Sequence, residues 1–177
     1  MLVFPRRLIF HELAHQVAYA PGDTLFNESF ATSVERIGSQ RWLTRRAGAA
    51  AQEAYRISDV RREDFRVLTQ RYRGLLDAVY RSADGDADKR RRKGEVMAQL
   101  RSDYETLKRE RWAGFSGYDA WFAHANNASF GVLGAYTDLV PNFERLFARM
   151  GDDFPRFYAE VRRLAALDLA GRRRELP

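Results

Sequence analysis

The chain has 177 residues, of which 45% are hydrophobic and 13% aromatic, which is enough for one packed domain. It contains no cysteine, and this excludes thiolate metal sites and disulfides. The net charge of +6 permits acidic partners such as nucleic acid or anionic lipid. The basic residues are scattered over helical patterns, however, so we expect solvated helix faces and no nucleic-acid partner.

The first predicted helix runs from near Arg6 to Tyr19 and contains the motif His-Glu-Leu-Ala-His. Residues four apart on an α-helix differ by about 40° around its axis, so His11 and His15 project from one face, one turn apart. Two imidazoles in this arrangement can bind one Zn²⁺. Glu12, on the flank of the same face, can take a proton from an attacking water. The motif therefore predicts a zinc-peptidase helix.

A catalytic zinc ion needs a third protein ligand, and the candidate is Glu28, thirteen residues after His15. The strong turn formers at residues 21–24 lie between them, and Asn27 is a candidate N-cap for a second helix that ends near Arg46. A helix, a tight turn and a returning helix would place Glu28 opposite the two histidines. The alternative is an acid in the first helical turn, favoured there by the helix dipole.

The next segment is predicted to form a long antiparallel helical hairpin. A third helix begins near Ser58 or Asp59, and a second apolar stripe covers residues 88–112. Residues 83–87 separate the two stripes and suit a turn. The four basic residues at 90–93 lie close to three aspartates, so a self-neutralised hairpin tip is the simpler interpretation than a binding patch.

Shorter helices are predicted beyond the hairpin. A short aromatic helix is expected at residues 118–122, a second ends near Tyr136, and two more cover residues 143–150 and 152–167. Residues 171–177 are expected to form a frayed tail. No segment of alternating polarity indicates a strand.

A zinc hydrolase also needs a hydrogen-bond donor for the oxyanion that forms when water attacks a carbonyl. Tyr136 and His124 are the candidates. Small residues before Tyr136 would let its helix approach the metal closely, although spacing alone favours a core aromatic. Asn126 and Asn127 are candidates for binding a substrate backbone, or they cap a helix.

Several motifs occur together in this chain. They are Ile-Phe-His-Glu-Leu-Ala-His-Gln at 9–16, Phe-Asn-Glu-Ser-Phe-Ala at 26–31, Arg-Trp-Leu at 41–43, and Asn-Asn-Ala at 126–128 followed by Tyr136 and Leu-Val-Pro-Asn-Phe-Glu at 139–144. With them the chain resembles, over nearly its whole length, a bacterial family of predicted aminopeptidases close to the gluzincin zinc metallopeptidases. The resemblance implies that His11, His15 and Glu28 bind zinc and that Glu12 is the general base. It also favours Tyr136 for oxyanion stabilisation.

The resemblance implies a location in the cell envelope or periplasm as well. Zinc peptidases of this type carry a β-sheet ahead of the active-site helix, and its edge strand pairs with the substrate backbone. Only ten residues precede His11, which leaves no room for that sheet. We therefore expect the chain to be the C-terminal part of a longer protein, whose missing N-terminal region would provide any membrane association.

The expected fold is mainly α, with a zincin-type catalytic subdomain in a single domain of residues 1–177. Zinc-site helices occupy residues 1–57, the hairpin residues 58–112, and helices that complete the site residues 113–177. The predicted function is a zinc-dependent peptidase, an aminopeptidase, that hydrolyses peptide substrates. The alternative is an inactive or truncated peptidase-like binding module that acts through the basic helical hairpin.

Overall fold

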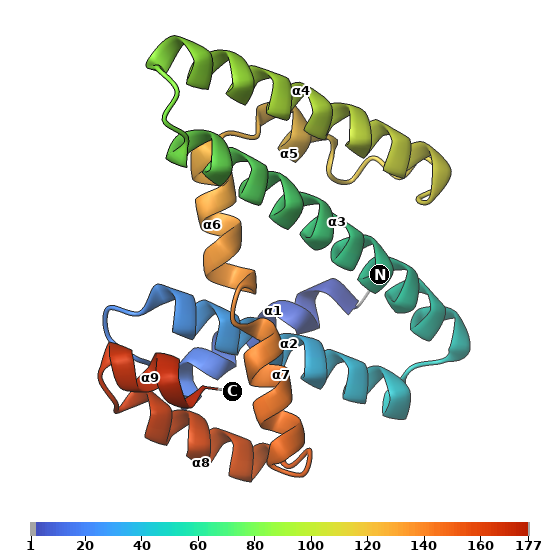
Figure 1. The fold of residues 1–177 in the computed structure, drawn as a ribbon. Coiled ribbons are helices and arrows are strands. Elements are labelled where there is room, and N and C mark those ends of the chain that lie inside the picture. The colour runs from blue at the N-terminus through green and yellow to red at the C-terminus, as the bar shows by residue number, and fades with distance from the viewer. Residues whose placement is uncertain (1–2, 177) are drawn as a thin grey trace. The chain divides into compact units, whose positions relative to one another are not determined.

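The computed structural model describes the backbone of residues 3–176 and the side chains of residues 8–176, and it consists of helices joined by short turns (Figure 1). The helices are α1 (Val3–Val17), α2 (Thr24–Arg46), α3 (Ala49–Arg81), α4 (Asp86–Glu110), α5 (Asp119–His124), α6 (Asn127–Thr137), α7 (Val140–Arg149), α8 (Phe154–Ala165) and α9 (Leu169–Glu175). No strand occurs in the described backbone, and the mainly α class is confirmed. None of the described helices is both long and apolar enough to cross a lipid bilayer.

The chain divides into two compact units. The first combines Met1–Tyr55 with Gly131–Pro177, and the second is Arg56–Phe130. The boundaries between the units fall inside α3 and α6. The histidine pair, Glu28 and Tyr136 all belong to the first unit, so the predicted zinc site can be described within one compact body.

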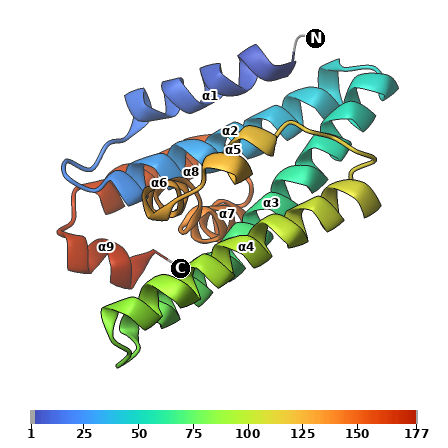
Figure 2. The same ribbon diagram turned by 90° about the horizontal axis from the view of Figure 1, so that it is seen from above.

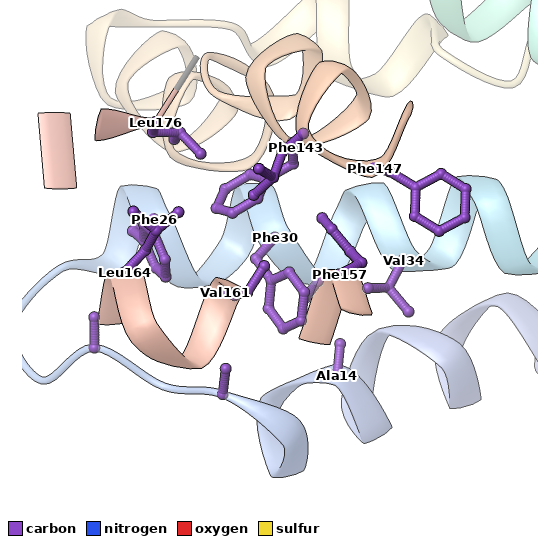
Figure 3. Packing of buried hydrophobic residues seen from close by; sticks show 14 residues of the cluster. Ala14, Phe26, Phe30, Val34, Phe143, Phe147, Phe157, Val161, Leu164 and Leu176 are labelled. Carbon is purple, nitrogen blue, oxygen red and sulfur yellow. The ribbon is translucent and has the colours of Figure 1, made fainter. Parts of the chain in front are cut away.

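The core of the first unit is built mainly from α2, α7 and α8 (Figure 3). Phe30 of α2 is fully buried, and its ring centroid lies 5.6 Å from that of Phe143 and 5.8 Å from that of Phe157. Each buried aromatic of this size contributes about 1.5–3 kcal/mol to folding. From α1 the core receives the small side chain of Ala14, and α1 lies alongside α2 (Figure 2). The histidine helix is thereby held close to the helix that carries Glu28.

Helix α3 begins at Ala49, well before the expected start near Ser58. The segment after Ala47, which is the extended C-cap of α2, is rich in alanine, the residue with the highest helix propensity. The residue before this start, Gly48, has no side chain that could cap the helix, so the sequence carries no side-chain capping signal at this boundary.

The expectation of a frayed C-terminal tail is wrong, because most of the segment forms α9. Arg172 of α9 is only 6% exposed. Its Nε donates to Oδ2 of Asp23 at 2.9 Å, and its guanidinium also donates to the carbonyl oxygens of Ala165 and Leu167. A buried charge needs such partners. The decisive partner, Asp23, lies 149 residues away in the sequence, so no local pattern reveals it.

In the second unit, α3 and α4 form the expected antiparallel hairpin. The hydroxyl of Tyr72 donates to Asp103 at 2.6 Å, and Nε of Arg111 donates to Asp64 at 2.7 Å. The residue number rises along one helix as it falls along the other, and this defines antiparallel packing.

Two arginines at the hairpin tip, Arg91 and Arg92, pair with nearby acids. Arg91 lies 2.8 Å from Glu95 and 3.3 Å from Asp88, and Arg92 pairs with Asp84. These pairs agree with a self-neutralised tip, and a binding role of the remaining basic residues stays a prediction.

Candidate metal centre

Helix α1 presents His11 and His15 from one face, one turn apart. Their ring centroids are 5.1 Å apart, and the ring planes are inclined at 78°. His11 is 9% exposed and His15 is half-buried. Ala14, between them in the sequence, is buried against the first unit's core, so this face of α1 is turned towards α2. The four-residue spacing of the motif therefore places the two imidazole rings next to each other, as predicted.

The turn between α1 and α2 is closed by Asn27. Its amide oxygen accepts from the N–H of Ala20 at 2.8 Å, and its amide nitrogen donates to the carbonyl oxygen of Ala20 at 2.9 Å. Asn27 lies inside α2, so its assignment as the N-cap is wrong. The cap is Asp23, whose carboxylate accepts from the N–H of Phe26 at 3.1 Å. Gly22 has a φ of +77°, which favours glycine in this turn.

Glu28 directs its carboxylate at both histidines. Its Oε2 lies 3.2 Å from Nε2 of His11, and its Oε1 lies 3.8 Å from Nε2 of His15. One possible ligand atom from each of the three residues lies within 4.8 Å of the other two. The first turn of α2, which begins at Thr24, contains no acidic residue, so the first-turn interpretation of Glu28 does not apply. The structure thus brings the three predicted ligands together.

The three donor groups suit a zinc ion. Imidazole nitrogens and a carboxylate oxygen are usual zinc ligands, and with bonds of about 2.1 Å neighbouring donors of a tetrahedral site lie roughly 3.3 Å apart. The 3.2 Å between His11 and Glu28 is close to this separation, and the 3.8 Å between His15 and Glu28 is slightly wider. Nδ1 of His15 is buried and has no hydrogen-bond partner among the described residues. The His15 ring is therefore not held at that nitrogen by another protein group.

Glu35 is a further member of this cluster that the motifs do not reveal. Its Oε2 lies 3.5 Å from Nδ1 of His11, on the opposite side of the ring from Glu28. The hydrogen bond with Glu35 has the largest influence on the pKa of His11; burial opposes it and Glu28 adds to it, so this pKa lies above its usual value of 6.5. Glu35 follows Glu28 by two helical turns, and this spacing is the signal that could have identified it.

Ser29 connects α2 to the end of α6 within the first unit. Its hydroxyl donates to the carbonyl oxygen of Ala135 at 3.2 Å and accepts from the N–H of Leu139 at 3.3 Å. This contact places Tyr136 beside the cluster. The Tyr136 ring stacks on that of His11 with a centroid separation of 6.1 Å and an interplanar angle of 23°.

The hydroxyl of Tyr136 lies in an acidic environment. Burial, the charge of Glu28 and a hydrogen bond with Glu28 raise the pKa of Tyr136, and the charge of Glu12 adds to this effect. Glu12 itself is exposed on α1, close to the cluster without belonging to the group of possible ligands. Tyr19, a neighbour that the motif does not reveal, places its ring 6.5 Å from that of His15.

The remaining candidates, His124, Asn126 and Asn127, belong to the second unit. The side-chain oxygen of Asn126 accepts from the N–H of Ala128 at 2.9 Å, which is the capping role that we gave as its alternative. The amide of Asn127 donates to the hydroxyl of Tyr80 at 2.7 Å. His124 is the last residue of α5. A role of these residues towards substrate stays a prediction.

Comparison with known proteins gives the family. The family model described as "Putative aminopeptidase" matches residues 6–176, so the chain belongs to this family. Searches of the curated proteins and of the solved structures each gave no match. The match includes all the residues of the metal-ligand cluster, and the family name indicates a peptidase.

Proposed function

We propose that the protein is a zinc-dependent metallopeptidase of the aminopeptidase type, with His11, His15 and Glu28 as the metal ligands. The observation that carries this proposal is the convergence of the three side chains, with ligand atoms within 4.8 Å of one another. The ligands come from two helices joined by a clamped turn. Two histidines and a glutamate from the following helix are also the ligand set that the resemblance to gluzincins implies.

Glu12 is the general base in this proposal. His11, His15 and Glu28 would hold the zinc ion, which would supply Lewis-acid activation of the attacking water. The exposed carboxylate of Glu12, one residue after His11, accepts the proton as the water attacks the peptide carbonyl. Glu12 then delivers the proton to the departing amine, because the amine must be protonated to leave.

Tyr136 donates to the developing oxyanion in this proposal. Its ring is held against His11, and the residue is 40% exposed, so its side chain is accessible to a bound substrate. The raised pKa keeps the hydroxyl protonated at neutral pH, and a protonated hydroxyl is what hydrogen-bond donation requires. A donor placed in this way is worth about 10²–10³ in turnover.

The test is metal analysis combined with a panel of peptides. Glu12→Gln is expected to keep stoichiometric zinc and to lose about 10²–10⁴ in turnover, because the general base is absent while the ligands are intact. Glu105→Gln, which removes an exposed acid of the second unit that pairs with Lys108, is the matched control and should leave both quantities unchanged. Full activity of Glu12→Gln would remove Glu12 from this role. A wild-type protein that takes up no zinc would favour the binding module instead.

A further inference from the structure

Both ring nitrogens of His11 face a carboxylate. Nε2 lies 3.2 Å from Glu28 and Nδ1 lies 3.5 Å from Glu35. The two glutamates are seven residues apart on α2, which is about two helical turns, so both project from the same face of the helix. The His11 ring is therefore held between two acids of one helix, and Glu28 also approaches His15.

The two acids have different consequences for metal binding. A neutral imidazole carries one proton, and it binds a metal through the nitrogen that lacks this proton. A carboxylate beside Nδ1 accepts a hydrogen bond from Nδ1–H and so leaves the lone pair on Nε2. Nε2 is the nitrogen that faces Glu28, the third ligand of the proposed centre.

We infer that Glu35 is a positioning residue of the metal centre, which holds His11 in the tautomer with the proton on Nδ1 and directs Nε2 towards the metal. This inference rests on the proposed function. It adds a residue outside the motifs, and it assigns to α2 two tasks that are separated by two turns: ligation by Glu28 and orientation of a ligand by Glu35.

Burial strengthens the contact between Glu35 and His11. Their side chains are 17% and 11% exposed, so water screens this hydrogen bond only partly. The helices also approach closely here, since a Cβ at Gly38 would lie 3.2 Å from the ring of Phe10, the residue before His11. Glycine at this position lets α2 come near enough to α1 for the Glu35 carboxylate to reach the imidazole.

The two histidines differ in this respect. Nδ1 of His15 is buried without a hydrogen-bond partner among the described residues, whereas Nδ1 of His11 faces Glu35. Removal of the Glu35 carboxylate should therefore change the tautomer of His11 and leave that of His15 as it is. A general loosening of the fold would affect both rings.

The test compares zinc affinity and imidazole tautomers in three variants. Glu35→Ala removes the acceptor, Glu35→Gln keeps the shape and a weaker acceptor, and Glu160→Gln is the control because Glu160 pairs with Arg163 in the same unit. Zinc affinity is measured by competition with a chelator. The tautomers are read from long-range ¹H–¹⁵N spectra of the zinc-free protein at a pH where the rings are neutral. The chain has only three histidines, so assignment is direct.

Glu35→Ala is expected to bind zinc about 10- to 100-fold more weakly, which is the usual cost of losing such a partner. Glu35→Gln should lie between Glu35→Ala and wild type, and Glu160→Gln should equal wild type. His11 should lose its Nδ1–H form in Glu35→Ala while His15 keeps its spectrum.

Two results would overturn the inference alone: wild-type zinc affinity in Glu35→Ala and Glu35→Gln, or an unchanged His11 tautomer in both. If Glu35→Ala does not fold, Glu35→Gln, which conserves the side-chain volume, decides by its zinc affinity: a wild-type value overturns the inference. A wild-type protein that binds no zinc would overturn the proposed function, and with it the metal-directed part of the inference.

Discussion

Glu28 of the first unit differs in its partners from the half-buried acids of the second unit. In the second unit they pair with cations, as Asp103 does with Arg71 at 3.2 Å and Asp64 with Arg111 at 2.7 Å. In the first unit the carboxylate of Glu28, 19% exposed, faces His11 and His15.

This difference indicates which carboxylates have lone pairs available for a ligand. An acid paired with arginine is electrostatically satisfied by the protein itself. An acid that faces imidazoles offers its lone pairs together with theirs, and a divalent cation is the species that satisfies all of them at once. In the proposed function, the histidines and Glu28 of the first unit therefore bind the metal ion, while the paired acids of the second unit stabilise its hairpin.

The largest expected effect comes from breaking the ligand set. His15→Ala should abolish stoichiometric zinc binding and peptide hydrolysis together, because only two of the three ligands remain. Metal analysis and a peptide assay measure the two effects. Asp103→Asn, which removes a paired acid of the second unit, should change neither quantity. Zinc retained in His15→Ala at the wild-type level would contradict the ligand assignment.

The next effect in size concerns Asp23, a buried acid of the first unit that pairs with arginine. Asp23→Asn keeps the oxygen that accepts from Phe26 but leaves Arg172, whose side chain is 8% exposed, without its charged partner. Breaking such a buried pair costs about 3–5 kcal/mol in the free energy of unfolding. Urea unfolding measures it. Asp153→Asn is the matched control, because Asp153 is an exposed N-cap of α8 and should cost much less.

Asp23 should also influence how the free energy of unfolding decreases at low pH. Burial raises the pKa of Asp23, but hydrogen bonds from Arg173, Phe26 and Arg172 outweigh it and hold this pKa below 3.8. A lowered pKa contributes stability that is present above pH 3.8 and is lost as the pH falls through the folded-state value. Unfolding curves at decreasing pH should show this loss in the wild type and less of it in Asp23→Asn.

The smallest effect is expected in the second unit. Tyr72→Phe removes a hydroxyl that donates to Asp103 at 2.6 Å, and this should cost about 1 kcal/mol of stability without changing zinc affinity. Burial and Asp103 raise the pKa of Tyr72 to about 12, so its contribution is complete below pH 10 and is lost as the pH rises towards 12. Urea unfolding at neutral and alkaline pH checks both statements. A drop in zinc affinity in this variant would contradict the expectation that Tyr72 has no influence on the metal site.

The parts of the molecule that the sequence predicts are those governed by local spacing. The histidine pair follows from the four-residue interval, and the hairpin follows from two apolar stripes around a turn. To place Glu28 near the histidines, one must also assume that the chain reverses direction at residues 21–24. The motif around Glu28 supports this assumption. Helix α3 starts directly after Gly48, which has no capping side chain, so the sequence pattern places the start of this helix too late.

What the sequence does not predict depends on contacts between distant segments. Glu35 has the spacing of Glu28, but its significance appears only when α1 packs on α2 and His11 lies between the two acids. The sequence predicts a frayed tail because the last residues of a domain are commonly poorly ordered. Its order depends on Asp23, which lies far away in the sequence.

Asn27, Glu28 and Ser29 are consecutive, and each reaches a different target: the first closes the turn at Ala20, the second meets the histidines, and the third holds Ala135. Successive residues of an α-helix are rotated by about 100°. A single insertion or deletion between the start of α2 and this triplet would therefore misdirect all three side chains at once. Insertions and deletions should therefore be rare at this place among related chains. They should be tolerated better at the hairpin tip between α3 and α4.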